Sequence, residues 1–99
     1  MIYCFDIDGT LCTKGHEDYK NAEPFLDRIK IVNDLYDEGN KIILFTARGA
    51  ATGIDWEDLT KEQAKAWGLK YNELIFGKPH ADVFIDDKAN DIFNWFSED

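Results

Sequence analysis

The stretch IYCFDIDGT at residues 2–10 decides the first part of the fold. Its opening residues are apolar without alternation, which is typical of a strand that is buried on both faces of a parallel sheet. Two carboxylates, Asp6 and Asp8, stand at the end of this buried run. A buried charge is costly unless it is paired or binds a metal, so the two aspartates indicate a functional site. The alternative is an ordinary strand followed by an Asp-Gly turn.

Three further apolar runs predict the rest of a sheet. They lie at residues 41–45 (KIILF), 73–76 (ELIF) and 82–85 (DVFI). Helical patterns separate or follow these runs, and such alternation is typical of a parallel sheet covered by helices. We therefore predict an α/β fold in one domain, residues 1–99. Its architecture is expected to be a three-layer, Rossmann-like parallel sheet with helices on both faces.

The first helix is predicted over residues 24–38. Pro24 suits the first helical position, and Gly39 with Asn40 stops the helix. Between these limits, residues at helical spacing form one apolar face. They are Phe25, Ile29, Val32 and Tyr36, with Leu26 and Leu35 alongside.

Two more helices are expected in the second half of the chain. Residues 47–57 have no clear period and are predicted to form a loop. Thr60 and Gln63 then resemble a capping box at the start of a helix that ends at Gly68. A last helix is predicted over about 89–96 from its apolar spacing.

Composition and charge limit the classes of partner. The chain has 99 residues, 44% of them hydrophobic, and a net charge of −9. Such an acidic protein is a poor partner for nucleic-acid phosphates or an anionic membrane, so we expect neither. Cys4 and Cys12 form no disulfide framework or zinc-binding spacing. The N-terminus resembles no signal peptide and no run approaches about 20 apolar residues, so a cytoplasmic location is expected.

Each predicted strand is followed by polar or charged residues that could bind a ligand or take part in a reaction. In an open parallel sheet, ligands bind beyond the carboxyl ends of the strands. The residues at these ends are Asp6 and Asp8, then Thr46 and Arg48, then Gly77, Lys78 and Pro79, and finally Asp86, Asp87 and Lys88. Four carboxylates at one rim repel one another unless a cation compensates them, and oxygen ligands suit Mg²⁺. We therefore predict a Mg²⁺ site formed by Asp6, Asp8, Asp86 and Asp87.

The same rim has the groups that phosphoryl transfer requires. The Thr46 hydroxyl and the Lys78 ammonium suit the oxygens of a phosphoryl group. A carboxylate can attack phosphorus and form an aspartyl-phosphate. A second carboxyl group two residues away can protonate the leaving oxygen and then activate water. We predict these two roles for Asp6 and Asp8.

Taken together, these motifs resemble those of the haloacid dehalogenase superfamily, specifically its phosphatases. FDIDGTL at 5–11 matches the first motif of that family, and ILFTAR at 43–48 matches the second. GKP at 77–79 matches the third motif, and FIDDKANDI at 84–92 matches the fourth. The resemblance spans nearly the whole chain.

The resemblance implies a role for each acidic residue. Asp6 would be the nucleophile and a Mg²⁺ ligand, and Asp8 the general acid/base whose backbone carbonyl also binds the metal. Asp87, with or without Asp86, would complete the metal shell. The family often has a further acid four residues on, which here is Asp91, so Asp87 is the preferred ligand. An aspartate at position 8 favours phosphate-ester hydrolysis over dehalogenation.

The remaining matched residues would hold the substrate. Thr46 and Lys78 would bind the transferring phosphoryl group. Gly9 permits a tight turn away from the site, and Thr10 can tie that turn by hydrogen bonding. Gly9, Thr10 and Arg48 are the candidate substrate-binding residues, and Arg48 suits an anionic or hydroxyl-bearing group.

The short connections leave no space for a cap domain, so the resemblance implies a capless member of the family. An open site implies either a large phosphorylated substrate or a neighbouring subunit that covers the site in a homo-oligomer. The FTAR segment at 45–48 and the short chain look like small phosphatases of bacterial capsule and surface-sugar synthesis. A phosphorylated sugar or sugar alcohol is therefore the expected small-molecule substrate.

Three alternatives stay open. A receiver-like signalling domain also combines acidic residues, Mg²⁺, a threonine and a Lys-Pro pair, but it keeps its phosphate. A non-catalytic binding domain could retain the same fold. A phosphotransferase would pass the phosphoryl group to a hydroxyl group, and fold alone does not distinguish it from a phosphatase.

Overall fold

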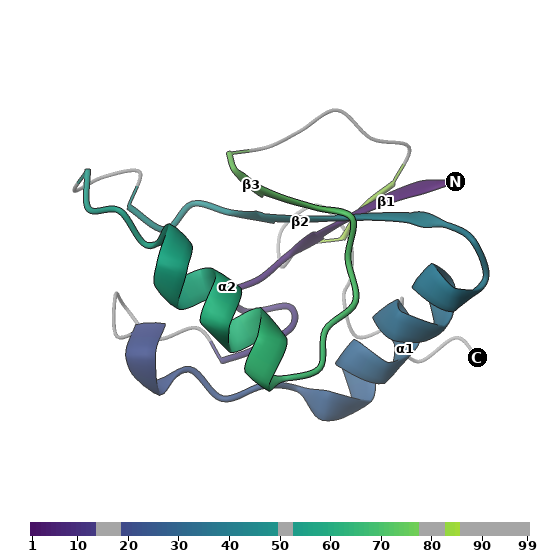
Figure 1. Cartoon of the computed structure of the whole chain (residues 1–99), viewed down its shortest axis with the longest axis horizontal. Helices are drawn as coiled ribbons and strands as arrows, with labels where there is room; N and C mark the ends of the chain where they lie inside the picture. The colour runs from purple at the N-terminus through teal and green to yellow at the C-terminus, as the bar shows by residue number, and fades with distance from the viewer. Residues whose placement is uncertain (14–18, 50–52, 78–82, 86–99) are drawn as a thin grey trace.

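The computed structural model describes residues 1–13, 19–49, 53–77 and 83–85. Along the chain lie β1 (Ile2–Asp6), the short 3₁₀ helix η1 (Tyr19–Asn21), α1 (Leu26–Asp37), β2 (Lys41–Thr46), α2 (Glu57–Ala66), β3 (Glu73–Phe76) and β4 (Val83–Ile85). The predicted alternation of strands and helices is confirmed over this part of the chain (Figure 1).

The four strands form one parallel sheet in the order β3-β2-β1-β4. β1 and β2 are the central strands, and Asp6 of β1 pairs with Phe45 of β2. Because all strands run in the same direction, their carboxyl ends lie at one edge of the sheet. This α/β arrangement is compatible with the predicted Rossmann-like fold.

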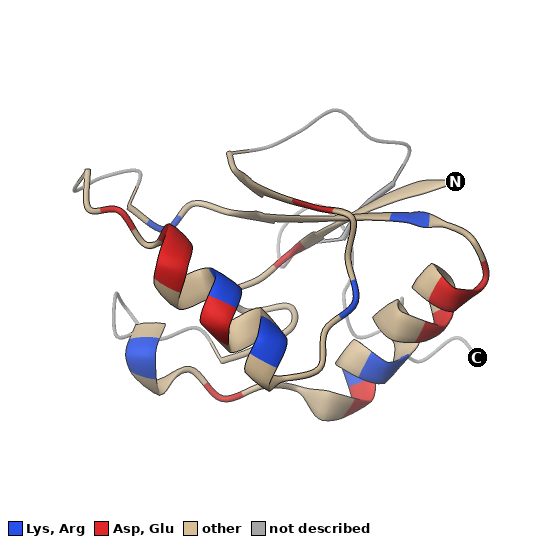
Figure 2. Ribbon diagram, in the orientation of Figure 1, with Lys and Arg blue, Asp and Glu red and all other residues tan. Residues whose placement is uncertain are grey.

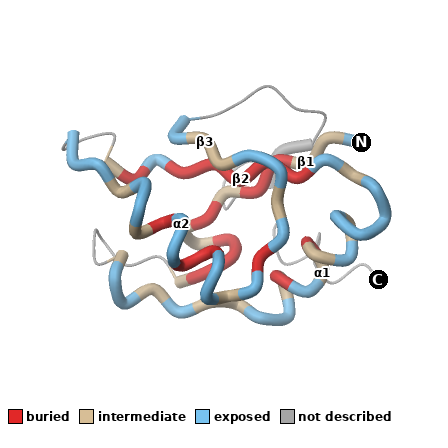
Figure 3. Tube along the Cα trace, in the orientation of Figure 1, coloured by how far each residue is buried: buried red, intermediate tan, exposed pale blue. Residues whose placement is uncertain are grey.

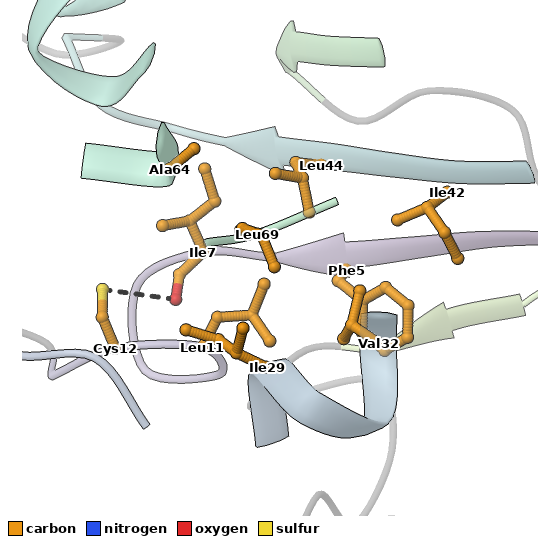
Figure 4. Close-up of a cluster of buried hydrophobic side chains, with 10 residues drawn as sticks. All are labelled: Phe5, Ile7, Leu11, Cys12, Ile29, Val32, Ile42, Leu44, Ala64 and Leu69. Atoms are coloured by element: carbon orange, nitrogen blue, oxygen red, sulfur yellow. Dashed lines mark hydrogen bonds between the residues drawn. The ribbon is translucent and has the colours of Figure 1, made fainter. Parts of the chain in front are cut away.

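One face of the sheet is covered by α1 and α2, which lie on the same side of it in Figure 1. Alternate residues of the central strands point to this face, among them Phe5, Ile42 and Leu44, all of which have no exposed surface. Ile29 and Val32 of α1 pack against them (Figure 4). Figure 3 shows the same pattern, with buried positions concentrated in β1 and β2. Burying each such side chain contributes about 1.5–3 kcal/mol, so this face holds the helices in place.

The opposite face has its own buried cluster. Cys4, Ile43 and Phe45 are buried there, and Ile2 and Ile75 pack against them. Among the residues that the structure describes, no helix contributes to this cluster. The helix predicted over about 89–96 lies outside the described residues, so the third layer stays a prediction.

Two features of the first helix were predicted wrongly. Pro24 is not its first residue, because α1 begins at Leu26 and Pro24 instead forms an isolated bridge with Cys12. Of the predicted apolar face, Leu26 is 64% exposed and Tyr36 is 36% exposed. The Phe25 amide donates to the Leu11 carbonyl, and this contact to the segment after β1 sets the start of the helix. The predicted stop at Gly39 is confirmed, with φ +95° at that residue.

The predicted start of the second helix was also wrong. α2 begins at Glu57, and the Asp55 carboxylate accepts the Glu57 amide at 2.9 Å. Thr60 and Gln63 are therefore inside the helix and buried instead of capping it. The predicted end near Gly68 is confirmed.

Charged residues recur along both helices (Figure 2), and nearly all of these positions are exposed. α1 has 12 residues and α2 has 10, whereas a bilayer-spanning helix needs about 20 apolar residues. Within the described ranges, no helix could therefore cross a membrane.

Candidate functional site

The carboxyl ends of β1 and β2 bring the first candidate residues together. Asp6 ends β1 and Thr46 ends β2. The Ile7 amide donates to the Phe45 carbonyl at 3.1 Å, so the pairing continues one residue beyond β1. The amides of the next turn then converge on the Ile7 carbonyl, at 3.3 Å from Thr10, 2.9 Å from Leu11 and 3.3 Å from Cys12. Gly9 has φ +84°, which confirms its predicted role in a tight turn.

Asp8 is held by two residues from the end of β2. Arg48 Nη2 donates to Asp8 Oδ1 at 2.8 Å, and Nε donates to Oδ2 at 3.0 Å. The Thr46 hydroxyl donates to Asp8 Oδ2 at 3.2 Å. The Arg48 side chain has no exposed surface, and that of Asp8 is 17% exposed. The bidentate contact between Arg48 and Asp8 fixes the orientation of the carboxylate as well as its position.

The other end of the Arg48 guanidinium reaches α2. Nη1 donates to Thr60 Oγ1 at 3.1 Å and to Gln63 Oε1 at 2.6 Å. The guanidinium also lies over the Tyr19 ring, 4.6 Å from its centroid, a favourable cation–π position. Thr60 and Gln63, which were predicted to cap the helix, are thus buried hydrogen-bond partners of the buried Arg48.

The burial of Arg48 leaves its side chain no exposed surface for the substrate contact that was predicted for it. Because its side chain is enclosed by protein groups, its anionic partner in this structure is Asp8. Direct contact between Arg48 and a substrate stays a prediction.

Cys12 lies beside the same carboxylate. Its Sγ is 3.6 Å from the Ile7 carbonyl oxygen (Figure 4) and 3.6 Å from Asp8 Oδ1. Burial, followed by the negative charge of Asp8, raises the pKa of the Cys12 thiol to about 12, although Arg48 acts in the opposite direction. The thiolate is the nucleophilic form of cysteine, so Cys12 is a packing residue of the site and not a nucleophile.

Thr10 is placed inside the turn and is fully buried. Its hydroxyl has no hydrogen-bond partner among the described residues, so the predicted tie through this hydroxyl is not formed there. Its carbonyl instead accepts a hydrogen bond from Arg28 Nη1 at 3.0 Å. Arg28 was missed in the sequence because nothing local indicates that this α1 residue reaches the turn after β1. Substrate binding by Gly9 and Thr10 stays a prediction.

The predicted metal site is only partly covered by the described residues. Asp6 supplies a carboxylate and Asp8 a backbone carbonyl oxygen, and oxygen ligands of both kinds fit Mg²⁺. The Asp8 carboxylate itself is paired with Arg48. Lys78, Asp86 and Asp87 lie outside the described residues. Within the described ranges, no group of three or more His, Cys, Asp or Glu side chains could hold a metal ion. The Mg²⁺ site therefore stays a prediction.

A pocket of about 320 Å³ opens beside Thr46. It lies between the carboxyl ends of β2 and β3 and the loop that leads to α2. Its described lining is Thr46, Ala47, Arg48, Gly49, Gly53, Ile54, Asp55, Trp56, Phe76 and Gly77. Several of these residues belong to the segment 47–57, which was predicted to form a loop.

The fold matches known structures, whereas no protein-family model and no curated protein matches the chain. The crystal structure of a target protein from Vibrio cholerae is 28% identical, over all of this chain and 90% of that one, with a TM-score of 0.79. A chain of the Pnkp1/Rnl/Hen1 complex is 19% identical, over 82% of this chain and 30% of that one, with a TM-score of 0.62. The second likeness concerns the fold alone. The comparisons therefore support the α/β fold, and any function has to be argued from the chemistry of the site.

Proposed function

We propose that this protein is a Mg²⁺-dependent phosphatase of the haloacid dehalogenase type that hydrolyses a phosphate monoester through an aspartyl-phosphate. The observation that carries the proposal is the meeting of Asp6, Asp8 and Thr46 at the carboxyl ends of the two central strands. The Thr46 hydroxyl bonds directly to the Asp8 carboxylate. This arrangement supports the proposed roles of Asp6 as nucleophile, Asp8 as acid/base and Thr46 as phosphoryl ligand, which the reaction needs close together.

The reaction divides into two steps. In the first, an Asp6 oxygen bonds to phosphorus while the bond from phosphorus to the leaving oxygen breaks, and Asp8 gives that oxygen a proton. In the second, Asp8 takes a proton from water, the water oxygen bonds to phosphorus, and the bond between Asp6 and phosphorus breaks. Inorganic phosphate leaves and both carboxyl groups return to their starting state.

Mg²⁺, when bound, would be held by Asp6, the Asp8 backbone carbonyl and Asp87, with or without Asp86, and it supplies positive charge for the phosphoryl oxygens. Thr46 and Lys78 would bind those oxygens directly. Arg48 acts as a positioning residue in this proposal. Its two contacts with Asp8 hold the ionised carboxylate in one orientation, in which it can take the proton from water in the second step.

The proposal includes the architecture and setting that the resemblance implies. The fold would be three-layered, with the segment 89–96 as a helix on the second face, and without a cap domain. The substrate would be a phosphorylated sugar or sugar alcohol in cytoplasmic surface-polysaccharide synthesis, and a second subunit could cover the open site. A phosphotransferase is the related alternative, since it would share the first step.

The test is phosphate release from a panel of phosphorylated sugars, sugar alcohols, nucleotides and phosphopeptides, with and without Mg²⁺. Asp6→Asn should lose turnover by a factor of at least about 100, because the nucleophile is removed. Asp34→Asn is the matched control, since Asp34 is an exposed α1 residue paired with Lys30, and it should keep full activity.

Three results would contradict the proposal or redirect it. Normal turnover by Asp6→Asn would exclude Asp6 as the nucleophile. A stable acyl-phosphate without turnover would favour the receiver-like alternative. A phosphorylated acceptor formed from added alcohols, without free phosphate, would identify a phosphotransferase.

A further inference from the structure

We infer that the pocket beside Thr46 binds the leaving group of the substrate, and that this group is a single sugar ring. The inference rests on the proposed phosphatase function. It concerns the five pocket residues Ala47, Ile54, Asp55, Trp56 and Phe76, which together we call the ring pocket.

The position of the ring pocket follows from residues that it shares with the reacting centre. Thr46 lines the pocket, and its hydroxyl also bonds to Asp8. Gly77, directly after β3, lines the pocket from the neighbouring strand. A phosphoryl group bound near Thr46 would therefore lie close to this pocket, and in the proposal its leaving group occupies the pocket.

The walls of the ring pocket are apolar and held in place. Ile54 is 52% exposed and Phe76 is 39% exposed, and both line the pocket, so they offer apolar surface to a ligand there. Trp56 is held edge-on by the Tyr19 ring, with centroids 5.0 Å apart and planes at 78°. Flat aromatic and aliphatic surfaces of this kind suit the C–H face of a sugar ring.

Contacts at Gly49 hold the residues that carry these walls. The Gly53 amide donates to the Gly49 carbonyl at 2.8 Å. A Cβ atom at Gly49 would lie 2.1 Å from the Ile54 carbonyl oxygen and 3.2 Å from Trp56 Cδ1. Ile54 and Trp56 are thus packed closely against Gly49, which holds this part of the pocket wall in place.

One polar group favours a sugar over a purely aromatic leaving group. Asp55 lines the pocket, and its carboxylate accepts the Glu57 amide through Oδ1. For its second oxygen, the described residues supply no donor. An ionised carboxylate only accepts hydrogen bonds, so it suits a ring with hydroxyl groups on its edge and is costly to cover with an aryl group.

The volume limits the size of the ligand. Ligand pockets commonly measure about 300–1,000 Å³, so about 320 Å³ is at the small end of that range. The pocket therefore has room for one monosaccharide unit.

The experiment compares a hexopyranose phosphate, the hexitol phosphate with the same number of carbons, and acetyl phosphate. We expect kcat/KM to be at least tenfold higher for the cyclic sugar than for the open-chain hexitol. Ala47→Phe fills the pocket from an exposed position of its wall, and it should lower kcat/KM for the cyclic sugar at least tenfold more than for acetyl phosphate. Ala66→Phe places the same side chain on an exposed α2 position outside the pocket and should preserve the ring preference.

Binding of the hexopyranose phosphate to Asp6→Asn, measured by calorimetry, gives a readout that does not need turnover. We expect Asp55→Asn and Ala47→Phe, each added to Asp6→Asn, to weaken this binding at least fivefold. Equal efficiency on ring and open chain, or an equal loss on all three substrates in Ala47→Phe, would overturn the inference while leaving the phosphatase proposal intact. Absence of turnover on every substrate, acetyl phosphate included, would instead contradict the proposed function.

Discussion

Replacing Arg48 with methionine should destabilise the protein strongly, because the buried Arg48 side chain links Asp8 to Thr60 and Gln63 of α2. The change removes the two-pronged pair with Asp8 and leaves a carboxylate whose side chain is only 17% exposed. Breaking a buried pair by removing one partner costs about 3–5 kcal/mol. Gln63 Oε1 loses its 2.6 Å hydrogen bond as well, and an unpaired buried acceptor adds about 1–3 kcal/mol. Since Asp8 is partly hydrated, we expect a total loss of about 4 kcal/mol in the free energy of unfolding.

The assay is urea unfolding at pH 7, followed by circular dichroism and tryptophan fluorescence. Lys41→Met is the control, because Lys41 and Glu73 form a 2.7 Å pair whose side chains are 47% and 46% exposed. A surface pair of this kind contributes at most about 1 kcal/mol. The control should therefore unfold close to the unaltered protein.

A double-mutant cycle with Asp8→Asn tests the physical reason. If Arg48→Met destabilises the protein by leaving the Asp8 charge unpaired, its loss in free energy of unfolding should be smaller by about 1–3 kcal/mol in the Asp8→Asn background. A loss below about 1 kcal/mol for Arg48→Met alone, or the same loss in both backgrounds, would refute the reasoning.

Two further predictions concern residues around the site. Gly49→Ala combines a left-handed φ of +83° with a Cβ 2.1 Å from the Ile54 carbonyl oxygen, whereas Gly53→Ala has φ +74° and no atom within 4 Å. Urea unfolding should show a loss of about 1–2 kcal/mol for Gly53→Ala, from backbone strain alone, and a clearly larger loss for Gly49→Ala; equal losses would argue against the close packing at Gly49. Cys12, with its pKa raised from 9.0 to about 12, binds its proton more tightly in the folded protein, so this residue's contribution to stability should be complete below pH 9 and be lost as pH rises toward 12. Comparing urea midpoints of the unaltered protein and Cys12→Ala at pH 8 and 10 measures this, and native Cys12 should also resist iodoacetamide at pH 8; rapid alkylation without urea would contradict it.

Local sequence patterns were sufficient to predict the strands and the C-terminal ends of the two described α-helices. The third strand was predicted at residues 73–76, which are the bounds of β3, because an apolar run between turn signals needs only its own residues to be recognised. The stop at Gly39 follows equally from local chemistry, since a residue with φ +95° is best supplied by glycine. The placement of Asp6 at the end of a buried strand was predicted for the same reason.

Local patterns failed where distant elements set the structure. Leu26 fits an apolar helical face, yet it is 64% exposed because the sheet contacts α1 through Ile29 and Val32. Thr60 and Gln63 have the spacing of a capping box, but α2 begins before them at Glu57. Inside the helix they accept hydrogen bonds from the buried Arg48 guanidinium. A polar residue that pairs with a buried charge cannot be told from a cap by spacing alone.

The sequence by itself determined which residues form strands, that the sheet is parallel, and that Asp6, Asp8 and Thr46 stand at strand ends. Only the tertiary structure decided the strand order β3-β2-β1-β4 and the partner of Asp8. Arg48 and Asp8 are 40 residues apart in the chain, so their contact depends on the packing of β1, β2 and α2 together. Hydrophobic periodicity reports the environment of each element separately, whereas a buried ion pair forms only where several packed elements exclude water around it.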